Sequence, residues 1–364
     1  MRPAPRLLLA LACATLPLAP APAGAQAPPL WGGVAPGPHA VGFRVEQRFD
    51  PARSREGSER GRPVRVALWY PARPAGARLT LRGYARLLAG PGEERRALSF
   101  PTDEAGPPAA RVDSLLALRT YAAAGAPAAT GRHPLVVLGM GWSYESPLMQ
   151  VVLAEYLVSR GYVVAAPVLA GTRSPEVRVD AADLETAVRD LEQAAVWART
   201  LPGVDPERLA VAGFDLGGMA AALLAMRDAR VDAVVSLDSG ILSDRLMREL
   251  MRPSPFYALD RLRAPLLHAT RPREENLARG LGEDLAVFDS AGAAPRYLLR
   301  VPGMRHADFA LWGMVEGVLP AFWGSVEGNP APKHAALLLR VGRFLDAWVR
   351  GDAGARAALD RDPR

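Results

Sequence analysis

Three titratable side chains follow predicted strands, and their types suit proton transfer and nucleophilic attack. Asp215, Asp238 and His306 each come at or shortly after the end of an apolar stretch with strand character. In a parallel sheet the carboxyl ends of the strands share one edge, so these side chains are expected to converge there. A histidine beside carboxylates can act as a general base while one carboxylate fixes its tautomer. We therefore predict a catalytic centre of Asp215, Asp238 and His306.

The sequence around Asp215 predicts a sharp turn between a buried strand and a helix. An apolar run precedes the turn and an Ala-rich run follows it, with glycines at Gly213, Gly217 and Gly218. These glycines let strand and helix pass closely around a strained central residue. The G-x-D-x-G pattern is the context of a nucleophile elbow, whose central residue is usually serine. Asp215 is thus a nucleophile, a general base or a turn residue without chemistry of its own.

Backbone N–H groups near this turn are predicted to bind a developing negative charge. The expected donors are Leu216, directly after the elbow residue, and Trp142, in a Gly-rich loop after the apolar run 134–138. A plain strand-to-helix turn is the alternative for this loop. The further residues expected beside the substrate pocket are Gly141, Ser143, Tyr144 and Glu145.

Four other titratable residues offer alternatives to this centre or have structural roles. Glu274 and Glu275 follow the next predicted strand and are the alternative acids. Asp308 is expected to cap a local helix, and His268 to lie within a strand as a core or strand-end histidine.

Helical and strand patterns alternate along the chain from residue 134 onward. Such alternation predicts an α/β fold with a doubly wound, mostly parallel sheet flanked by helices. Two further strands are expected earlier. The predicted strands are 41–49, 64–70, 134–138, 162–166, 209–214, 231–237, 265–269 and 296–301, and the predicted helices are 147–160, 180–199, the one after the elbow, and 333–349.

The predicted organisation is a single domain over residues 41–350 between less regular ends. An insertion at about 72–133 shows a helix near 111–123 and no strong strand, and is interpreted as part of a lid, as a linker or as a packing element. Residues 26–40 are interpreted as a loose leader and 351–364 as a C-terminal tail.

The N-terminus is typical of a cleaved secretory signal peptide. A short basic stretch precedes a mostly apolar run over 7–18, and Ala23-Gly24-Ala25 is a small-residue cleavage pattern. We expect residues 1–25 to be removed and the mature protein to be secreted or periplasmic. Cys13, the single cysteine, would leave with this peptide, which excludes disulfides in the mature chain.

Composition narrows the class of partner. Hydrophobic residues make up 49% and charged residues 23%, as in soluble globular proteins. The net charge is +6, and nearly all basic residues are arginines. No dense basic patch is interspersed with aromatic residues, so nucleic-acid binding is not expected. A second long apolar segment, a phosphate loop and a metal-ligand motif are missing, so we expect no stable membrane span, cofactor or metal. A small-molecule substrate is predicted, and the oligomeric state is open.

Several stretches resemble the dienelactone hydrolase and platelet-activating-factor acetylhydrolase-like branch of the α/β-hydrolases. They are 64–71, 134–167, 204–218 and 231–238. The resemblance implies a sheet of the α/β-hydrolase type, an elbow nucleophile that attacks an ester, and no metal. Asp238 and His306 match the family's acid and histidine. Asp215 stands where the family has serine, and Met140-Gly141 replaces its His-Gly pair.

The elbow aspartate also resembles that of epoxide hydrolases and haloalkane dehalogenases, which attack saturated carbon. Leu216, however, replaces the tryptophan common after their nucleophile, and no large cap domain is evident. An aspartate that attacks an ordinary ester would form an unfavourable anhydride. Three functions therefore stay open: hydrolysis of an ester-like apolar substrate, hydrolysis at saturated carbon, and ligand binding by a catalytically silent relic.

Overall fold

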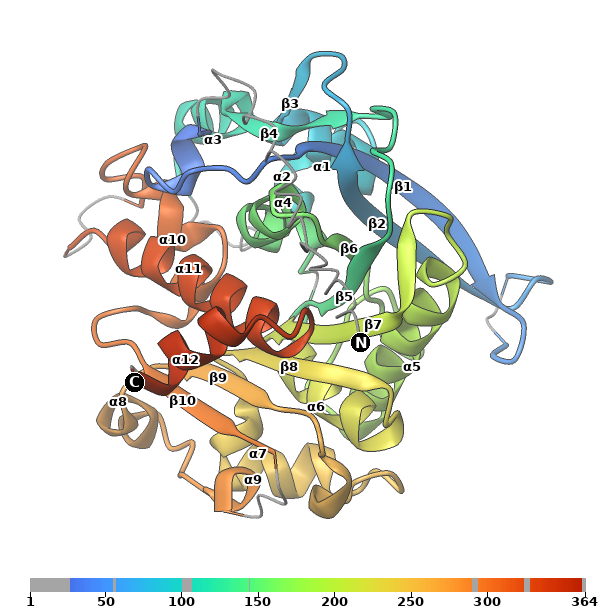
Figure 1. The fold of residues 1–364 in the computed structure, drawn as a ribbon, viewed down its shortest axis with the longest axis vertical. Coiled ribbons are helices and arrows are strands. Elements are labelled where there is room, and N and C mark those ends of the chain that lie inside the picture. The colour runs from blue at the N-terminus through green and yellow to red at the C-terminus, as the bar shows by residue number, and fades with distance from the viewer. Residues whose placement is uncertain are drawn as a thin grey trace, which may run out of the picture.

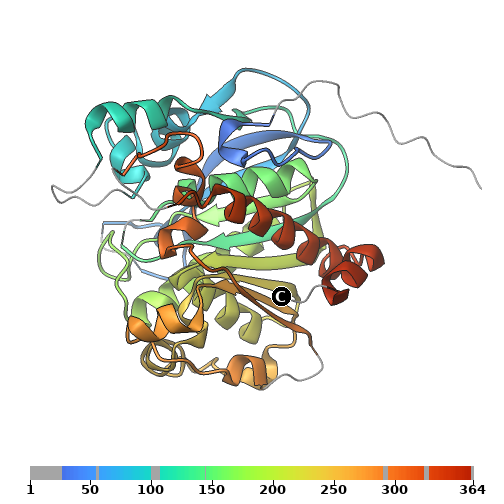
Figure 2. The same ribbon diagram turned by 90° about the vertical axis from the view of Figure 1, so that its left-hand side faces the viewer.

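The computed structural model describes residues 27–54, 57–99, 107–143, 145–289, 294–323 and 328–361. These residues form one sheet of ten strands with helices on both faces (Figures 1 and 2). The predicted signal peptide and Tyr144 lie outside the described residues.

Six neighbouring strands form the parallel part of the sheet. In spatial order they are β10 (Arg296–Arg300), β9 (Leu266–Thr270), β8 (Val231–Leu237), β7 (Val204–Phe214), β5 (His133–Gly139) and β6 (Val163–Pro167). Except in the edge strand β10, their central residues are buried on both faces, which accounts for the continuous apolar runs in the sequence. This part confirms the prediction of a doubly wound, mostly parallel α/β sheet.

The other four strands extend the sheet beyond β6. They are β2 (Arg62–Ala72), β1 (Ala40–Asp50), β4 (Arg119–Ala124) and β3 (Arg78–Thr80). β2 runs antiparallel to both β6 and β1, and β4 is parallel to β1. The sheet is therefore mixed at this edge.

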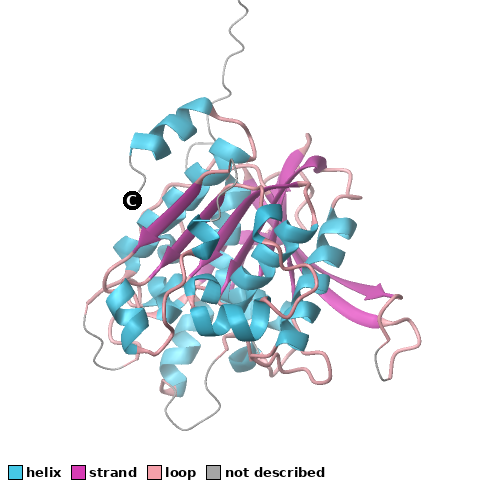
Figure 3. Ribbon diagram, turned by 90° about the horizontal axis from the view of Figure 1, so that it is seen from below, coloured by secondary structure: helices cyan, strands magenta, loops and turns pink. Residues whose placement is uncertain are grey.

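Two pairs of helices cover the sheet, one pair on each face (Figures 2 and 3). α4 (Val151–Ser159) packs with α11 (Ala331–Trp348), and α5 (Ala181–Ala198) packs with α6 (Leu216–Arg227). The other helices are α1 (Leu81–Ala89), α2 (Glu94–Ala97), α3 (Ala109–Ala117), α7 (Asp244–Leu246), α8 (Arg273–Ala278), α9 (Ala286–Asp289), α10 (Trp312–Val315) and α12 (Ala353–Arg361). Short helical turns are η1 (Pro29–Trp31), η2 (Pro147–Gln150), η3 (Gly240–Leu242), η4 (Met247–Met251), η5 (Leu259–Arg261) and η6 (His306–Phe309).

The prediction for the insertion at about 72–133 is partly wrong, because this segment adds two strands to the sheet. The expected helix at 111–123 ends at Ala117, and the chain turns extended at Leu118 to enter β4. Alanine-rich β4 has weak strand propensity of its own. Its pairing with β1, Val41 opposite Ala122, determines its conformation.

The prediction of a loose leader over 26–40 is also wrong for its described part. Leu30 and Trp31 are buried, and the Trp31 ring lies 5.1 Å from the Tyr121 ring and 6.1 Å from the Tyr156 ring. A tryptophan buries a large apolar area, so this short turn is anchored to the core. At the other end, the predicted tail contains α12, which buries Leu359.

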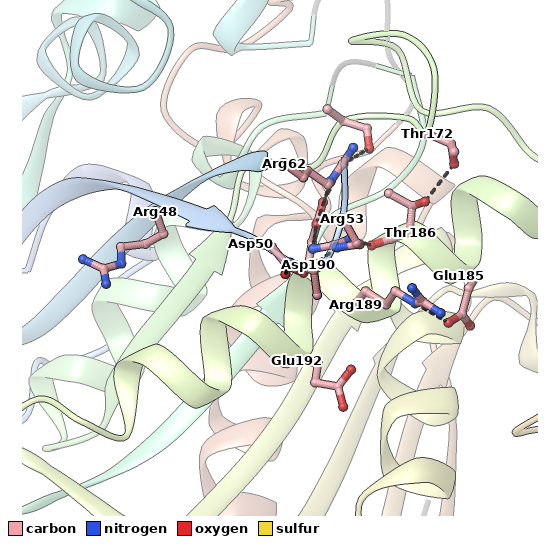
Figure 4. A network of polar contacts seen from close by, with 12 residues as sticks. Arg48, Asp50, Arg53, Arg62, Thr172, Glu185, Thr186, Arg189, Asp190 and Glu192 are labelled. Atoms are coloured by element: carbon pink, nitrogen blue, oxygen red, sulfur yellow. Dashed lines mark hydrogen bonds and ion pairs between the residues drawn. The ribbon is translucent and has the colours of Figure 1, made fainter. Parts of the chain in front are cut away.

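A buried polar network ties the ends of β1 and β2 to helix α5 (Figure 4). Asp190 accepts both arms of Arg62 at 2.8 and 3.0 Å and pairs with Arg53 at 2.7 Å. Arg62 also donates to the carbonyls of Ala170 and Gly171. The network therefore fixes the loop after β6 that leads toward the candidate site.

Among the described residues, no helix has both the length and the apolar character required to cross a membrane.

Candidate active site

The turn between β7 and α6 holds Asp215 in a strained conformation. Its φ of 51° and ψ of −123° lie in a region that residues with a Cβ rarely adopt. A Cβ on Gly213 would lie 2.1 Å from the backbone of Gly217, and one on Gly217 would lie 2.4 Å from the backbone of Gly139. The glycines thus allow close crossing of strand and helix, which lifts Asp215 to the sheet edge.

The structure brings the three predicted side chains together. His306, in η6, places Nδ1 2.7 Å from Asp238 Oδ2 and Nε2 3.8 Å from Asp215 Oδ1. The imidazole ring stacks on Phe214 with a centroid distance of 4.7 Å. The contact between His306 Nδ1 and Asp238 is a hydrogen bond, whereas the distance between Nε2 and Asp215 is too long for one. His306 Nε2 therefore forms no hydrogen bond with Asp215 and is available to bond to a water or substrate atom.

Asp238 is held as an anion by several donors. Its Oδ1 accepts from the Thr270 hydroxyl at 2.8 Å, and its Oδ2 accepts from Arg271 Nε at 2.8 Å. Burial alone would raise the pKa of Asp238, but His306, Arg271 and Thr270 together lower it to about 2. The predicted alternative acid Glu274 instead lies exposed on α8.

The pKa values of Asp215 and His306 are both raised, but for different reasons. Burial raises the pKa of Asp215, against the opposing effects of His306 and of the N–H groups of Trp142 and Leu216. Burial would lower the pKa of His306, but the hydrogen bond to Asp238 and the nearby carboxylates raise it. A protonated His306 is thus stabilised between two carboxylates.

The predicted oxyanion donors lie at the site and face carboxylates. The N–H of Trp142 donates to Asp215 Oδ2 at 3.5 Å, and the N–H of Leu216 also stabilises the Asp215 carboxylate. The N–H of Gly141 donates to Glu145 Oε2 at 2.8 Å. Asp215 therefore takes donors that a serine in its place would leave to substrate.

Ser143 and its neighbours shape the loop above the site. Ser143 has a φ of 62°, and its backbone forms two hydrogen bonds with Val177, of 2.7 and 2.9 Å. These bonds fasten the loop after β5 to the loop after β6. The predicted role of Ser143 in substrate binding stays a prediction.

A cavity of about 380 Å³ opens beside the three side chains. Trp142 and Val179 line it and are about half exposed. Its floor and walls also include Met219, Leu242, Leu246, Leu250, Arg245, Arg271 and Arg279. The size suits a small molecule, and the lining combines apolar side chains with a similar number of polar and charged ones.

Sequence reasoning missed the partners that surround the acid and the elbow. Thr270 and Arg271 contact Asp238 from the end of β9, a position that the strand pattern could have indicated. Glu145 was expected near the pocket, but its closeness to Asp215 was not predicted. The close approach depends on the path of the loop, which has no local sequence signal.

Two residues set aside from the centre have the structural roles expected of them. His268 is buried in β9, its Nδ1 lies 3.0 Å from the Ser236 hydroxyl, and burial lowers its pKa to about 4. Asp308 accepts from the N–H of Arg305 at 2.7 Å, which caps η6. Both predictions are confirmed.

No group of three or more histidine, cysteine, aspartate or glutamate side chains suited to a metal occurs in the described part of the chain.

Comparisons with known proteins agree with this architecture. Residues 122–259 match the model of the dienelactone hydrolase family. Among solved structures, the chain is similar to a ferulic acid esterase from Streptomyces cinnamoneus, with a TM-score of 0.64 and 25% identity over 88% of this chain and 93% of that chain. No curated protein sequence matches significantly. The chain is thus an α/β-hydrolase-fold protein similar to carboxylic ester hydrolases.

Proposed function

We propose that this protein is an extracytoplasmic hydrolase of small, ester-like, largely apolar substrates, with Asp215, Asp238 and His306 as its centre. The observation that carries the proposal is the position of His306, hydrogen-bonded to Asp238 and facing Asp215 beside a cavity. The likeness to the dienelactone hydrolase family and to a ferulic acid esterase supports an ester substrate.

Asp238 and His306 have distinct roles in ester hydrolysis. Asp238 accepts the Nδ1–H of His306 and so leaves the Nε2 lone pair of the neutral ring free. His306 Nε2 takes a proton from water, whose oxygen attacks the acyl carbon. The same proton then passes to the departing alkoxide as the C–O bond breaks. In this route the N–H of Trp142 donates to the substrate carbonyl oxygen instead of to Asp215.

A second candidate, hydrolysis at saturated carbon, is favoured by the orientation of Asp215. Its Oδ2 already accepts the N–H of Trp142, which leaves Oδ1 toward His306. Attack by Oδ1 would form an alkyl ester and release the leaving group with its electron pair. The ester would remove the Asp215 charge that raises the pKa of His306. His306 would then lose its proton more readily, when a base is needed to activate water.

A substrate panel tests the proposal and separates the two candidates. Nitrophenyl esters, epoxides and haloalkanes are compared for the wild type, His306→Ala and the control His39→Ala. His39 lies far from the three side chains, against the ring of His133. We expect turnover that is lost in His306→Ala and kept in His39→Ala. Turnover unaffected by His306→Ala would contradict the proposal, and no turnover of any class would favour the silent relic.

Mass spectrometry of His306→Ala decides the role of Asp215. Attack at saturated carbon predicts a substrate adduct on the peptide that contains Asp215, because water activation is removed after alkylation. Ester hydrolysis by activated water predicts no adduct.

The extracytoplasmic location is tested by the intact mass of exported protein. We expect a chain that begins at Gln26, because cleavage after Ala25 fits the small-residue pattern. Exported protein that retains residues 1–25 would contradict cleavage.

A further inference from the structure

A second carboxyl group, that of Glu145, approaches Asp215 over Gly141. The N–H of Gly141 donates to Glu145 Oε2 at 2.8 Å. A Cβ placed on Gly141 would lie 2.3 Å from this oxygen and 2.8 Å from Asp215 Oδ2. The two carboxyl groups therefore converge on one point of the backbone, and only glycine leaves room for both.

Few donors are available to neutralise two negative charges at this point. Successive backbone N–H groups serve the pair: that of Gly141 bonds to Glu145, and that of Trp142 bonds to Asp215 at 3.5 Å. Carboxylates that share a site repel each other, and one of them then binds a proton more tightly.

His306 and the N–H of Gly141 oppose protonation of Glu145, but burial and the charge of Asp215 outweigh them. Burial and the charge of Asp215 raise the pKa of Glu145 to about 8, although His306 and the N–H of Gly141 lower it. On its other side, Glu145 borders a second cavity of about 340 Å³, which Arg65 and Arg96 also line. The balance of these effects favours a proton on Glu145.

We propose that Glu145 and Asp215 hold one proton between them in the free protein, and that Glu145 is a positioning residue for Asp215. A neutral Glu145 donates its O–H to Asp215 Oδ2, and Oδ1 stays directed at His306. A charged Glu145 would repel Asp215 from the backbone donors. The inference rests on the proposed function only in taking Asp215 as a functional group of the site.

Carboxyl ¹³C NMR tests the shared proton without any turnover. Spectra are recorded across pH for the wild type, Glu145→Gln and Glu192→Gln, the last a control on α5 whose side chain is 44% exposed. We expect one glutamate resonance that titrates near pH 8, absent in Glu145→Gln and present in Glu192→Gln. A Glu145 resonance that titrates below about pH 5.5, near the range of ordinary glutamates, would overturn the proposal.

The pH profile of turnover tests the positioning role. Glutamine keeps the shape and a donor but cannot ionise. We expect wild-type activity to decline above pH 8 as Glu145 ionises. Glu145→Gln should retain at least about a third of the activity at pH 7 without this decline, while Glu145→Ala should lose at least about tenfold in kcat. A decline above pH 8 in Glu145→Gln equal to that of the wild type would overturn the role. If the hydrolase proposal fails, the wild type shows no turnover. The NMR titration still tests the shared proton in that case, because it requires no turnover.

Discussion

Asp215 differs from the serine usual at this turn because it brings its own acceptors to the backbone donors. The N–H groups of Trp142 and Leu216 stabilise its carboxylate, while His306 faces its second oxygen. A serine hydroxyl would instead have His306 as its general base and would leave the backbone N–H donors free to bind the substrate. The identity of this one residue therefore decides which reaction the surrounding machinery can serve.

Asp215→Ser should convert the site toward ordinary ester hydrolysis. The variant frees the backbone donors and removes one carboxylate from a crowded site. We expect activity on short-chain activated esters to rise about 10- to 100-fold over the wild type, which corresponds to about 1.4–2.8 kcal/mol of barrier. Asp215→Asn, which supplies no nucleophile, is the control and should show no gain. A folded Asp215→Ser without a gain would show that donors or histidine are misplaced.

Asp238 should contribute to stability in a defined range of acidic pH. Its pKa is lowered in the fold from 3.8 to about 2, so the fold favours the charged form. This stabilisation is present above about pH 4 and is lost as pH falls toward 2; the shift corresponds to about 2 kcal/mol. Urea unfolding at pH 2.5–6 should show the wild-type advantage over Asp238→Asn shrinking as pH falls. Parallel stability curves for the two proteins would contradict this account.

At the scale of elements, the crossing of β7 and α6 is what presents Asp215. The approach of the two backbones leaves no space for a side chain at Gly213 or Gly217. The loop after β5 provides the facing donors, and its hydrogen bonds to Val177 connect it to the loop that Arg62 holds. The site is thus a property of packed turns between strands and helices.

Gly213→Ala should destabilise the protein through packing. The added methyl group would meet the Gly217 backbone at 2.1 Å, and backbone cannot move aside as a flexible side chain can. We expect a loss on the order of 2 kcal/mol or more in the free energy of unfolding. Gly203→Ala, where nothing lies within 4 Å of the added Cβ, should stay within about 0.5 kcal/mol. Equal effects of the two substitutions, measured by urea unfolding, would contradict the packing argument.

At the scale of the whole molecule, the sequence predicts the parts of the fold whose signals are local. The apolar runs of β5, β7 and β8 and the glycines of the turn between β7 and α6 are enough to place Asp215 and Asp238 at neighbouring strand ends. The strand β4 and the anchored Trp31 were not predictable in this way, since partners distant in sequence determine both conformations. Likewise, the meeting of Glu145 with Asp215 depends on a loop path that no periodicity encodes.

The central claim is that Asp215, Asp238 and His306 act as one unit, and their non-additivity tests it most directly. The measurement is kcat/KM of Asp215→Asn, Asp238→Asn, His306→Ala and the triple variant on the best substrate of the panel. Each single change should lower kcat/KM by at least about 100-fold. The kcat/KM of the triple variant should be no more than about tenfold lower than that of the least active single variant. Losses that multiply across the three changes, or any single variant that keeps more than half of the wild-type activity, would contradict the claim.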